Sequence, residues 1–190
     1  MRKLLVGFSL LSLLSFGVLA APALAPTNFA GTWALDKAKS KDLPPQMENI
    51  DSYTLTVTQD AQQLTVDTKI TRKESADQGA PGAGGPGSGG GRGGGMGMGP
   101  RGPQTYKLDG AEATLDTGGR GTATVKAEWQ DGGKTLKLVT KRTFNFQGND
   151  VTSTNTEVWS LSGDGKTLTI QRTNESPRGT QSSTLVFNKQ

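Results

Sequence analysis

Hydrophobic and polar side chains alternate with a period of two through the second half of the chain. Between residues 122 and 130, polar residues separate Ala123, Val125, Ala127 and Trp129. The same alternation runs through the stretches 134–147, 151–162, 166–174 and 180–188. Because successive side chains of a β-strand point to opposite faces, this pattern predicts a series of strands that each bury one face.

The first half of the chain carries the same signal in shorter pieces. Strands are predicted over residues 29–36, 52–59, 63–72, 104–109 and 111–116. Breaks rich in Gly and Asp separate the strands at intervals of about 8–16 residues, as in antiparallel all-β domains. Sequential hairpins that close on themselves predict an antiparallel up-and-down barrel of about 8–10 strands. A sandwich of two sheets is the alternative.

The N-terminus has the pattern of a signal peptide over residues 1–20. Arg2 and Lys3 precede an apolar run over residues 4–19, and small residues then fit cleavage at 20/21 or 23/24. A retained membrane anchor is the alternative reading of the run. The interpretation that we favour is a secreted or periplasmic protein with no stable membrane insertion after the signal is removed.

A glycine-rich tract interrupts the strand pattern at residues 79–102. Glycine makes up more than half of it, mixed with Pro, Ala, Arg and Met. Such a composition cannot bury enough apolar surface to offset the entropy lost on ordering. We therefore expect a disordered insertion within a single β-barrel domain that spans residues 26–190.

Composition removes several kinds of chemistry. The chain contains no Cys and no His, which excludes disulfides, Cys- or His-ligated metals, and Ser-His-Asp or Cys-His catalysis. The acidic residues fall largely in predicted turns, where turn chemistry accounts for them. No enzyme activity, cofactor or metal is expected, and the small net charge of +4 does not indicate a nucleic-acid partner. The oligomeric state is not determined by the sequence.

Three arginines share the parity of the apolar strand faces, namely Arg72, Arg142 and Arg172. A guanidinium inside a barrel can bind a carboxylate or phosphate in bidentate fashion. The hypothesis is a ligand-binding cavity that these arginines share with four aromatic residues, Trp33, Trp129, Phe144 and Trp159. The alternative places the arginines near strand ends, with their heads in solvent or paired with Glu157.

The first predicted strand resembles the start of known barrel families. Gly31-Thr32-Trp33, preceded by Phe29, resembles the Gly-x-Trp opening of lipocalins and the Phe-x-Gly-x-Trp opening of fatty-acid-binding proteins. The stretches 35–40 and 157–169 resemble segments of small exported lipocalin-like bacterial proteins, which are mostly uncharacterised. Gly31 itself predicts that a neighbouring group approaches this strand closely.

The resemblance implies a calycin-type barrel and a small hydrophobic or amphiphilic ligand. The last predicted strand carries Leu185 and Phe187 but lacks the Arg-x-Tyr pair of fatty-acid-binding proteins, so that ligand triad is not implied. Lipocalins have an arginine after their last barrel strand, and this sequence shows no such segment after residue 188. The expected function is a lipocalin-like barrel that binds an amphiphilic or anionic ligand in its interior. A non-catalytic structural or interaction module of the cell envelope is the alternative.

Overall fold

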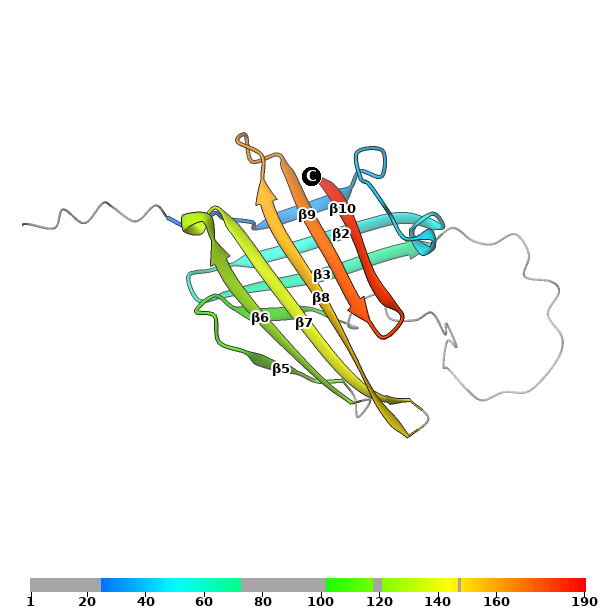
Figure 1. The fold of residues 1–190 in the computed structure, drawn as a ribbon. Coiled ribbons are helices and arrows are strands. Elements are labelled where there is room, and N and C mark those ends of the chain that lie inside the picture. Colours follow the sequence, from blue (N-terminus) through cyan, green and yellow to red (C-terminus); the bar gives the residue numbers. More distant parts are fainter. Residues whose placement is uncertain (1–24, 73–101, 118–120, 147) are drawn as a thin grey trace, which may run out of the picture.

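One antiparallel sheet curls into a nearly closed barrel (Figure 1). The computed structural model describes residues 25–72, 102–117, 121–146 and 148–190. Its ten strands are β1 (Gly31–Leu35), β2 (Ile50–Gln59), β3 (Gln63–Arg72), β4 (Gln104–Lys107), β5 (Ala113–Leu115), β6 (Thr122–Gln130), β7 (Thr135–Phe146), β8 (Asn149–Leu161), β9 (Thr167–Ser176) and β10 (Gly179–Lys189). Short 3-10 helices, η1 (Pro45–Met47) and η2 (Asp131–Gly133), lie in the β1–β2 and β6–β7 connections.

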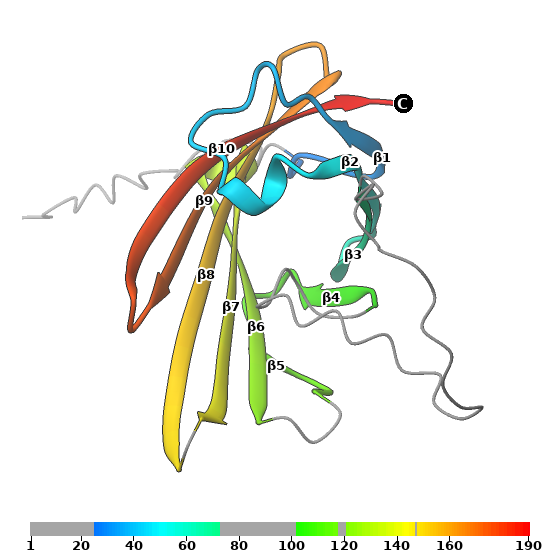
Figure 2. The ribbon, with the colours of Figure 1, turned by 90° about the vertical axis from the view of Figure 1, so that its right-hand side faces the viewer.

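The strand order is that of an up-and-down barrel. Strands that are consecutive in sequence pair as neighbours, β1 pairs with β10, and β4 and β5 form the two edges of the sheet. Figure 2 shows β4 and β5 on the side where the barrel is least closed. The predicted all-β fold is therefore confirmed, and the alternative of two separate sheets is wrong because one sheet contains all ten strands.

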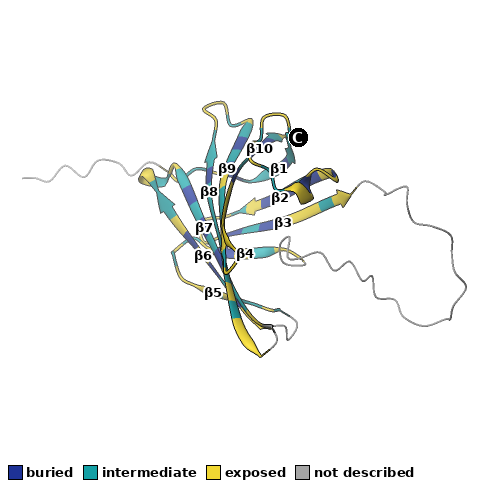
Figure 3. Ribbon diagram, turned by 45° about the vertical axis from the view of Figure 1, so that its right-hand side comes forward, coloured by how far each residue is buried: buried dark blue, intermediate teal, exposed yellow. Residues whose placement is uncertain are grey.

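Apolar side chains at alternate positions explain why the sheet wraps around a single core. On β7 the inward residues Leu136 and Leu138 are 0% and 2% exposed, and on β9 Leu168 and Ile170 are fully buried. Figure 3 shows this alternation as buried positions spaced along the strands, whereas the end of β3 and the tip of the β7–β8 hairpin are exposed. Burial of these side chains stabilises the barrel by about 1.5–3 kcal/mol for each fully buried aliphatic residue.

One end of the barrel, here called the closed end, contains the β2–β3, β6–β7 and β8–β9 turns. Phe29, just before β1, fills it by stacking on Trp129 at 6.1 Å and meeting Trp159 edge-on at 5.9 Å. The backbone N–H of Thr27 donates to the Gly133 carbonyl at 2.8 Å, which ties the segment before β1 to the β6–β7 turn. The closed end is thus sealed by packed aromatic rings.

The glycine of the first strand has the role that its position predicts. Gly31 has φ +144°, and a Cβ there would lie 2.9 Å from Cε of Lys189. The Lys189 ammonium in turn lies 5.2 Å from the centroid of the Trp33 ring. The predicted close approach to this strand is therefore confirmed, and the approaching group is a lysine side chain.

The connection between β1 and β2, residues 36–49, packs along the barrel beside β10 (Figure 2). Backbone hydrogen bonds join Lys41 and Thr184 in both directions, at 2.8 and 3.0 Å. Met47 of η1 and Ile50 at the start of β2 are buried in the core. The connection therefore contributes to the core as well as linking the strands.

Strand boundaries differ from the prediction mainly at short strands. The stretch 111–116 forms only the short β5, which extends from Ala113 to Leu115, and the stretch 29–36 begins its strand at Gly31. The predicted signal peptide and residues 79–101 of the predicted insertion lie outside the described residues. Within the described part of the chain, no helix is long and apolar enough to cross a membrane.

Candidate ligand-binding site

At the barrel end opposite the closed end, here called the open end, several side chains with inward parity are exposed. It is formed by the β7–β8 and β9–β10 turns and the last residues of β3. Phe144 has the inward parity of Leu136 and Leu138 on β7, yet it is 41% exposed. Thr68 on β3 and Asn174 on β9 also have inward parity and are exposed. These three positions are therefore in contact with solvent.

Polar side chains from several strands, here called the polar layer, meet in the interior, and an ion pair lies at their centre. Glu157 on β8 is in register with Arg172 on β9. The guanidinium donates from Nη2 and Nε to Oε1 of Glu157 at 2.8 and 2.9 Å. The Arg172 and Glu157 side chains are only 22% and 14% exposed, so the pair is largely withdrawn from water.

Neighbouring polar groups complete the hydrogen bonding of this pair. The Trp159 indole donates to Oε2 of Glu157 at 2.9 Å, and the Asn155 amide donates to Oε1 at 3.1 Å. Nη2 of Arg172 also donates to the Tyr53 hydroxyl at 3.2 Å, which connects β9 to β2 across the interior. A buried ion pair needs such additional hydrogen bonds because its own attraction does not fully offset desolvation.

The environment keeps both members of the pair charged. Burial alone would raise the pKa of Glu157, but Arg172 and the donors Trp159 and Asn155 outweigh it and hold that pKa below its ordinary value. Burial alone would lower the pKa of Arg172, but Glu157 and Tyr53 outweigh it and raise that pKa. Arg172 is therefore already neutralised by a carboxylate within the protein.

A second polar group joins β4 to β7 across the barrel. The Tyr106 hydroxyl lies 3.2 Å from Oγ1 of Thr140 and donates to Oε1 of Gln104 at 3.2 Å. Burial raises the pKa of Tyr106, so the phenol stays neutral. Nε2 of Gln104 is buried and has no hydrogen-bond partner among the described residues. A buried donor without an acceptor is uncommon in native proteins and calls for an explanation.

Arg142 lies one inward position beyond Thr140 on β7, toward the open end. Its side chain is half-buried, and burial lowers its pKa. An arginine nevertheless stays protonated at neutral pH, because the guanidinium is a very strong base. Within the described ranges, Arg142 has no ion-pair or hydrogen-bond partner. It is therefore a partly desolvated cation with free donors.

The structure places the three predicted arginines in different settings. Arg172 is held by Glu157, which matches the alternative that paired Glu157 with one arginine. Arg142 stands unpaired within the described chain at the open end. Arg72 is the last residue of β3, opposite Ile50, and it is exposed. The sequence pattern grouped these residues, but their contacts separate them.

The predicted aromatic residues divide between the two ends. Trp33 and Trp159 are 0% and 1% exposed, and Trp129 is half-buried against Phe29 at the closed end. Phe144 lies at the open end, directly opposite Val151 on β8. Phe144 is therefore the member of this aromatic set that lies exposed at the open end.

Other residues of the polar layer were not singled out from the sequence. Gln104, Tyr106, Thr140 and Asn155 all take part in the interior hydrogen bonds described above. Asn155 and Thr140 have the inward parity of Trp159 and Leu138 on their own strands. A polar residue at an inward position was the signal that could have identified them.

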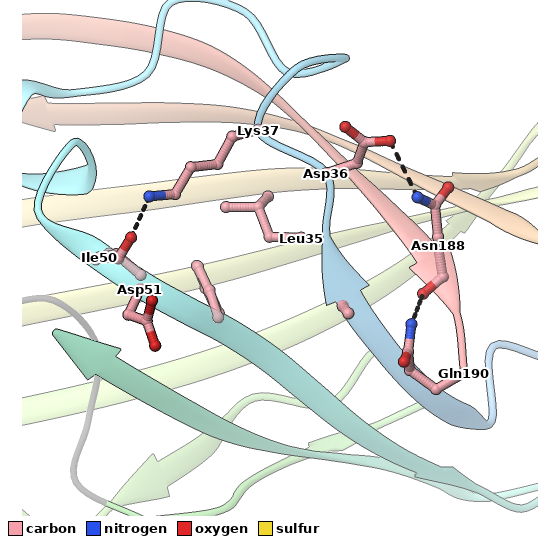
Figure 4. Close-up of a pocket in the computed structure, with 9 residues that line it drawn as sticks. Leu35, Asp36, Lys37, Ile50, Asp51, Asn188 and Gln190 are labelled. Carbon is pink, nitrogen blue, oxygen red and sulfur yellow. Dashed lines mark hydrogen bonds between the residues drawn. The ribbon is translucent and has the colours of Figure 1, made fainter. Parts of the chain in front are cut away.

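A wedge-shaped pocket of about 480 Å³ opens between β1 and β2 (Figure 4). The two strands separate there because their pairing ends at Ala34 and Thr54. The Lys37 ammonium donates to the Ile50 carbonyl across the wedge, and Asn188 donates to Asp36 at 3.0 Å on its β10 side. Leu35 and Tyr53 also line it. The wedge thus lies beside β2, the strand that also carries Tyr53 of the polar layer.

A smaller pocket of about 260 Å³ lies at the closed end, between the segment before β1 and the β2–β3 turn. Pro26, Asn28, Gln59, Leu108 and Trp129 are among the residues that line it. It contains no unpaired cation among its described lining residues, so it lacks the charge found at the open end.

No protein-family model matches the chain. No curated protein sequence matches it either. Among solved structures, it is similar to the zebrafish ileal bile acid-binding protein complexed with cholic acid, with a TM-score of 0.44 and 13% sequence identity. The alignment covers 85% of this chain and 98% of that protein. A similarity of this size does not assign a family or a ligand to the chain.

Proposed function

We propose that this protein is a non-enzymatic barrel that binds a small amphiphilic molecule in the interior of its open end. The proposal rests on one observation: Arg142 is partly desolvated, faces inward and has no counter-charge among the described residues. Desolvating a cation is unfavourable unless something pairs with it. A ligand that enters the open end would supply the missing interaction.

The walls near Arg142 offer apolar surface for the rest of such a molecule. Phe144 and Val151 face each other on β7 and β8, and Phe144 is the large hydrophobic side chain most exposed among the described residues. Leu115 on β5 pairs with Ala123, which in turn pairs with Arg142. An apolar wall with a few polar groups is the usual composition of a small-molecule site.

Binding can be measured with the uncharged dye N-phenyl-1-naphthylamine, and native mass spectrometry after mild purification would detect a retained ligand. We expect saturable dye binding that weakens about ten-fold in Phe144→Ser, equivalent to about 1.4 kcal/mol. Val139→Ser is the matched control, because Val139 lies on the same strand with outward parity. Absence of dye binding and of any retained ligand would contradict the proposal and favour an interaction module of the cell envelope.

We propose further that the protein acts outside the cytoplasm, in the periplasm or as a secreted protein. The support is the sequence of residues 1–20, with Arg2 and Lys3 before an apolar run and small residues after it. N-terminal sequencing of the protein from extracellular or periplasmic fractions is expected to give a start at residue 21 or 24. An intact Met1 in those fractions would contradict cleavage.

A further inference from the structure

We infer that the head group bound at the open end is an oxyanion, and that Arg142 and the amide of Gln104 bind it. This inference rests on the proposed function and adds the chemical class of the ligand. A carboxylate, sulfonate or phosphate ester presents acceptor oxygens that match a guanidinium fork and an amide donor.

The strand geometry brings these two residues to the same level of the barrel. The Tyr106 hydroxyl on β4 and the Thr140 hydroxyl on β7 are 3.2 Å apart, so side chains from the two strands meet across the interior there. β4 runs away from the open end and β7 runs toward it. Gln104 and Arg142 are therefore each one inward position nearer the open end than this contact.

Both residues present donors without acceptors. Nε2 of Gln104 is buried and unpartnered within the described residues, while its Oε1 accepts from Tyr106 and is thereby fixed. Arg142 donates to no described group. A pair of unmet donors, one of them cationic, is complementary to an anion with several lone pairs and not to a cation or an apolar group.

The remaining charged groups of the interior do not compete for this role. Arg172 already donates to Glu157 with both Nε and Nη2, and its other contact is the Tyr53 hydroxyl. Glu157 lies one level deeper than Thr140, in register with Leu138, and Arg172 neutralises it. Arg142 is therefore the inward-facing cation at this level that is available to a ligand.

The test compares two ligands of equal chain length, decanoate and decan-1-ol, as competitors of the uncharged dye. The wild-type protein is expected to bind decanoate about ten-fold or more tightly than decan-1-ol. Arg142→Gln is expected to weaken decanoate binding about ten-fold and so to remove that preference, and Gln104→Glu to weaken decanoate binding by repulsion. Lys141→Gln is the matched control, because it removes the same charge from the outer face of the same strand.

The outcomes separate this inference from the proposed function. If the dye does not bind at all, the proposed function fails. If the dye binds but Arg142→Gln keeps the preference for decanoate, the anion site is overturned while the binding function stands. Displacement of the dye by inorganic phosphate alone at comparable concentration would overturn the assignment to an amphiphile. Arg142→Lys should restore part of the preference, because it keeps the charge and loses only the planar fork.

Discussion

At the scale of single residues, the interior contains one arginine that is paired with a carboxylate and one that has no counter-charge among the described residues. Arg172 and Arg142 follow the same parity rule and lie on strands that face the same interior. Arg172 is paired because register places Glu157 beside it, whereas Arg142 is in register with Ser153 and Ala123, which carry no charge. Cross-strand partners therefore decide which arginine is available.

Removing one member of the Glu157–Arg172 pair should destabilise the fold. Glu157→Gln is expected to lower the free energy of unfolding by about 2–4 kcal/mol, because it leaves a largely buried guanidinium without a counter-charge. The double variant Glu157→Gln/Arg172→Met should be more stable than Glu157→Gln alone, since no buried charge remains. Urea unfolding followed by tryptophan fluorescence measures both. A Glu157→Gln variant as stable as the wild type would show that the pair is not needed.

At the scale of elements, the segment before β1 acts as the seal of the closed end. Phe29 is fully buried between Trp129 and Trp159, and its backbone N–H donates to Gln59 at 2.9 Å. The segment contributes no strand of its own, but the Phe29 ring completes the core at this end of the barrel.

Removing the Phe29 ring should lower the free energy of unfolding. Phe29→Ala is expected to destabilise the protein by about 3–5 kcal/mol, because it leaves a cavity among packed aromatic rings. Ala30→Ser, at the next position, is the control and should change stability by less than about 0.5 kcal/mol. Thermal and urea unfolding would measure both variants. Equal stability of Phe29→Ala and wild type would mean that the closed end does not depend on this ring.

At the scale of the whole molecule, carboxyl groups in several parts of the fold have lowered pKa values. For Glu157 burial would raise the pKa, but the Arg172 guanidinium and the side-chain hydrogen bonds together outweigh burial. For Asp36 the leading cause is the Asn188 amide, and for Asp60 it is the Gln62 backbone N–H. A carboxyl with a lower pKa in the folded chain binds fewer protons when folded. Its contribution to stability is present above the unfolded pKa and is lost as pH falls through the folded pKa.

The free energy of unfolding is therefore expected to be constant near neutral pH and to fall as pH drops below about 4.5, the ordinary range for these carboxyl groups. Urea unfolding at a series of pH values measures this fall. The double variant Glu157→Gln/Arg172→Met should show a smaller fall, since the buried carboxyl is gone. A stability that rises toward acid pH would contradict the assigned direction of these shifts.

The alternation of side chains was enough to predict the strands, their inward faces and the barrel class. Trp33 and Trp159 were identified as inward-facing residues, and both are buried. The proposed shared cavity is where sequence reasoning reached its limit, because parity fixes the face of a strand but not the depth of a residue along the barrel. Trp129 and Phe144 therefore share a predicted face and lie at opposite ends.

The sequence by itself determined that this chain forms antiparallel strands with one apolar face, because that property depends on the local period of two. Only the tertiary structure decided that Glu157 meets Arg172, that Tyr106 meets Thr140, and that Phe29 closes one end. These contacts join residues that are 15, 34 and 130 positions apart, and they depend on strand register and barrel closure. No local pattern encodes such distances, because they arise when the whole sheet packs around its core.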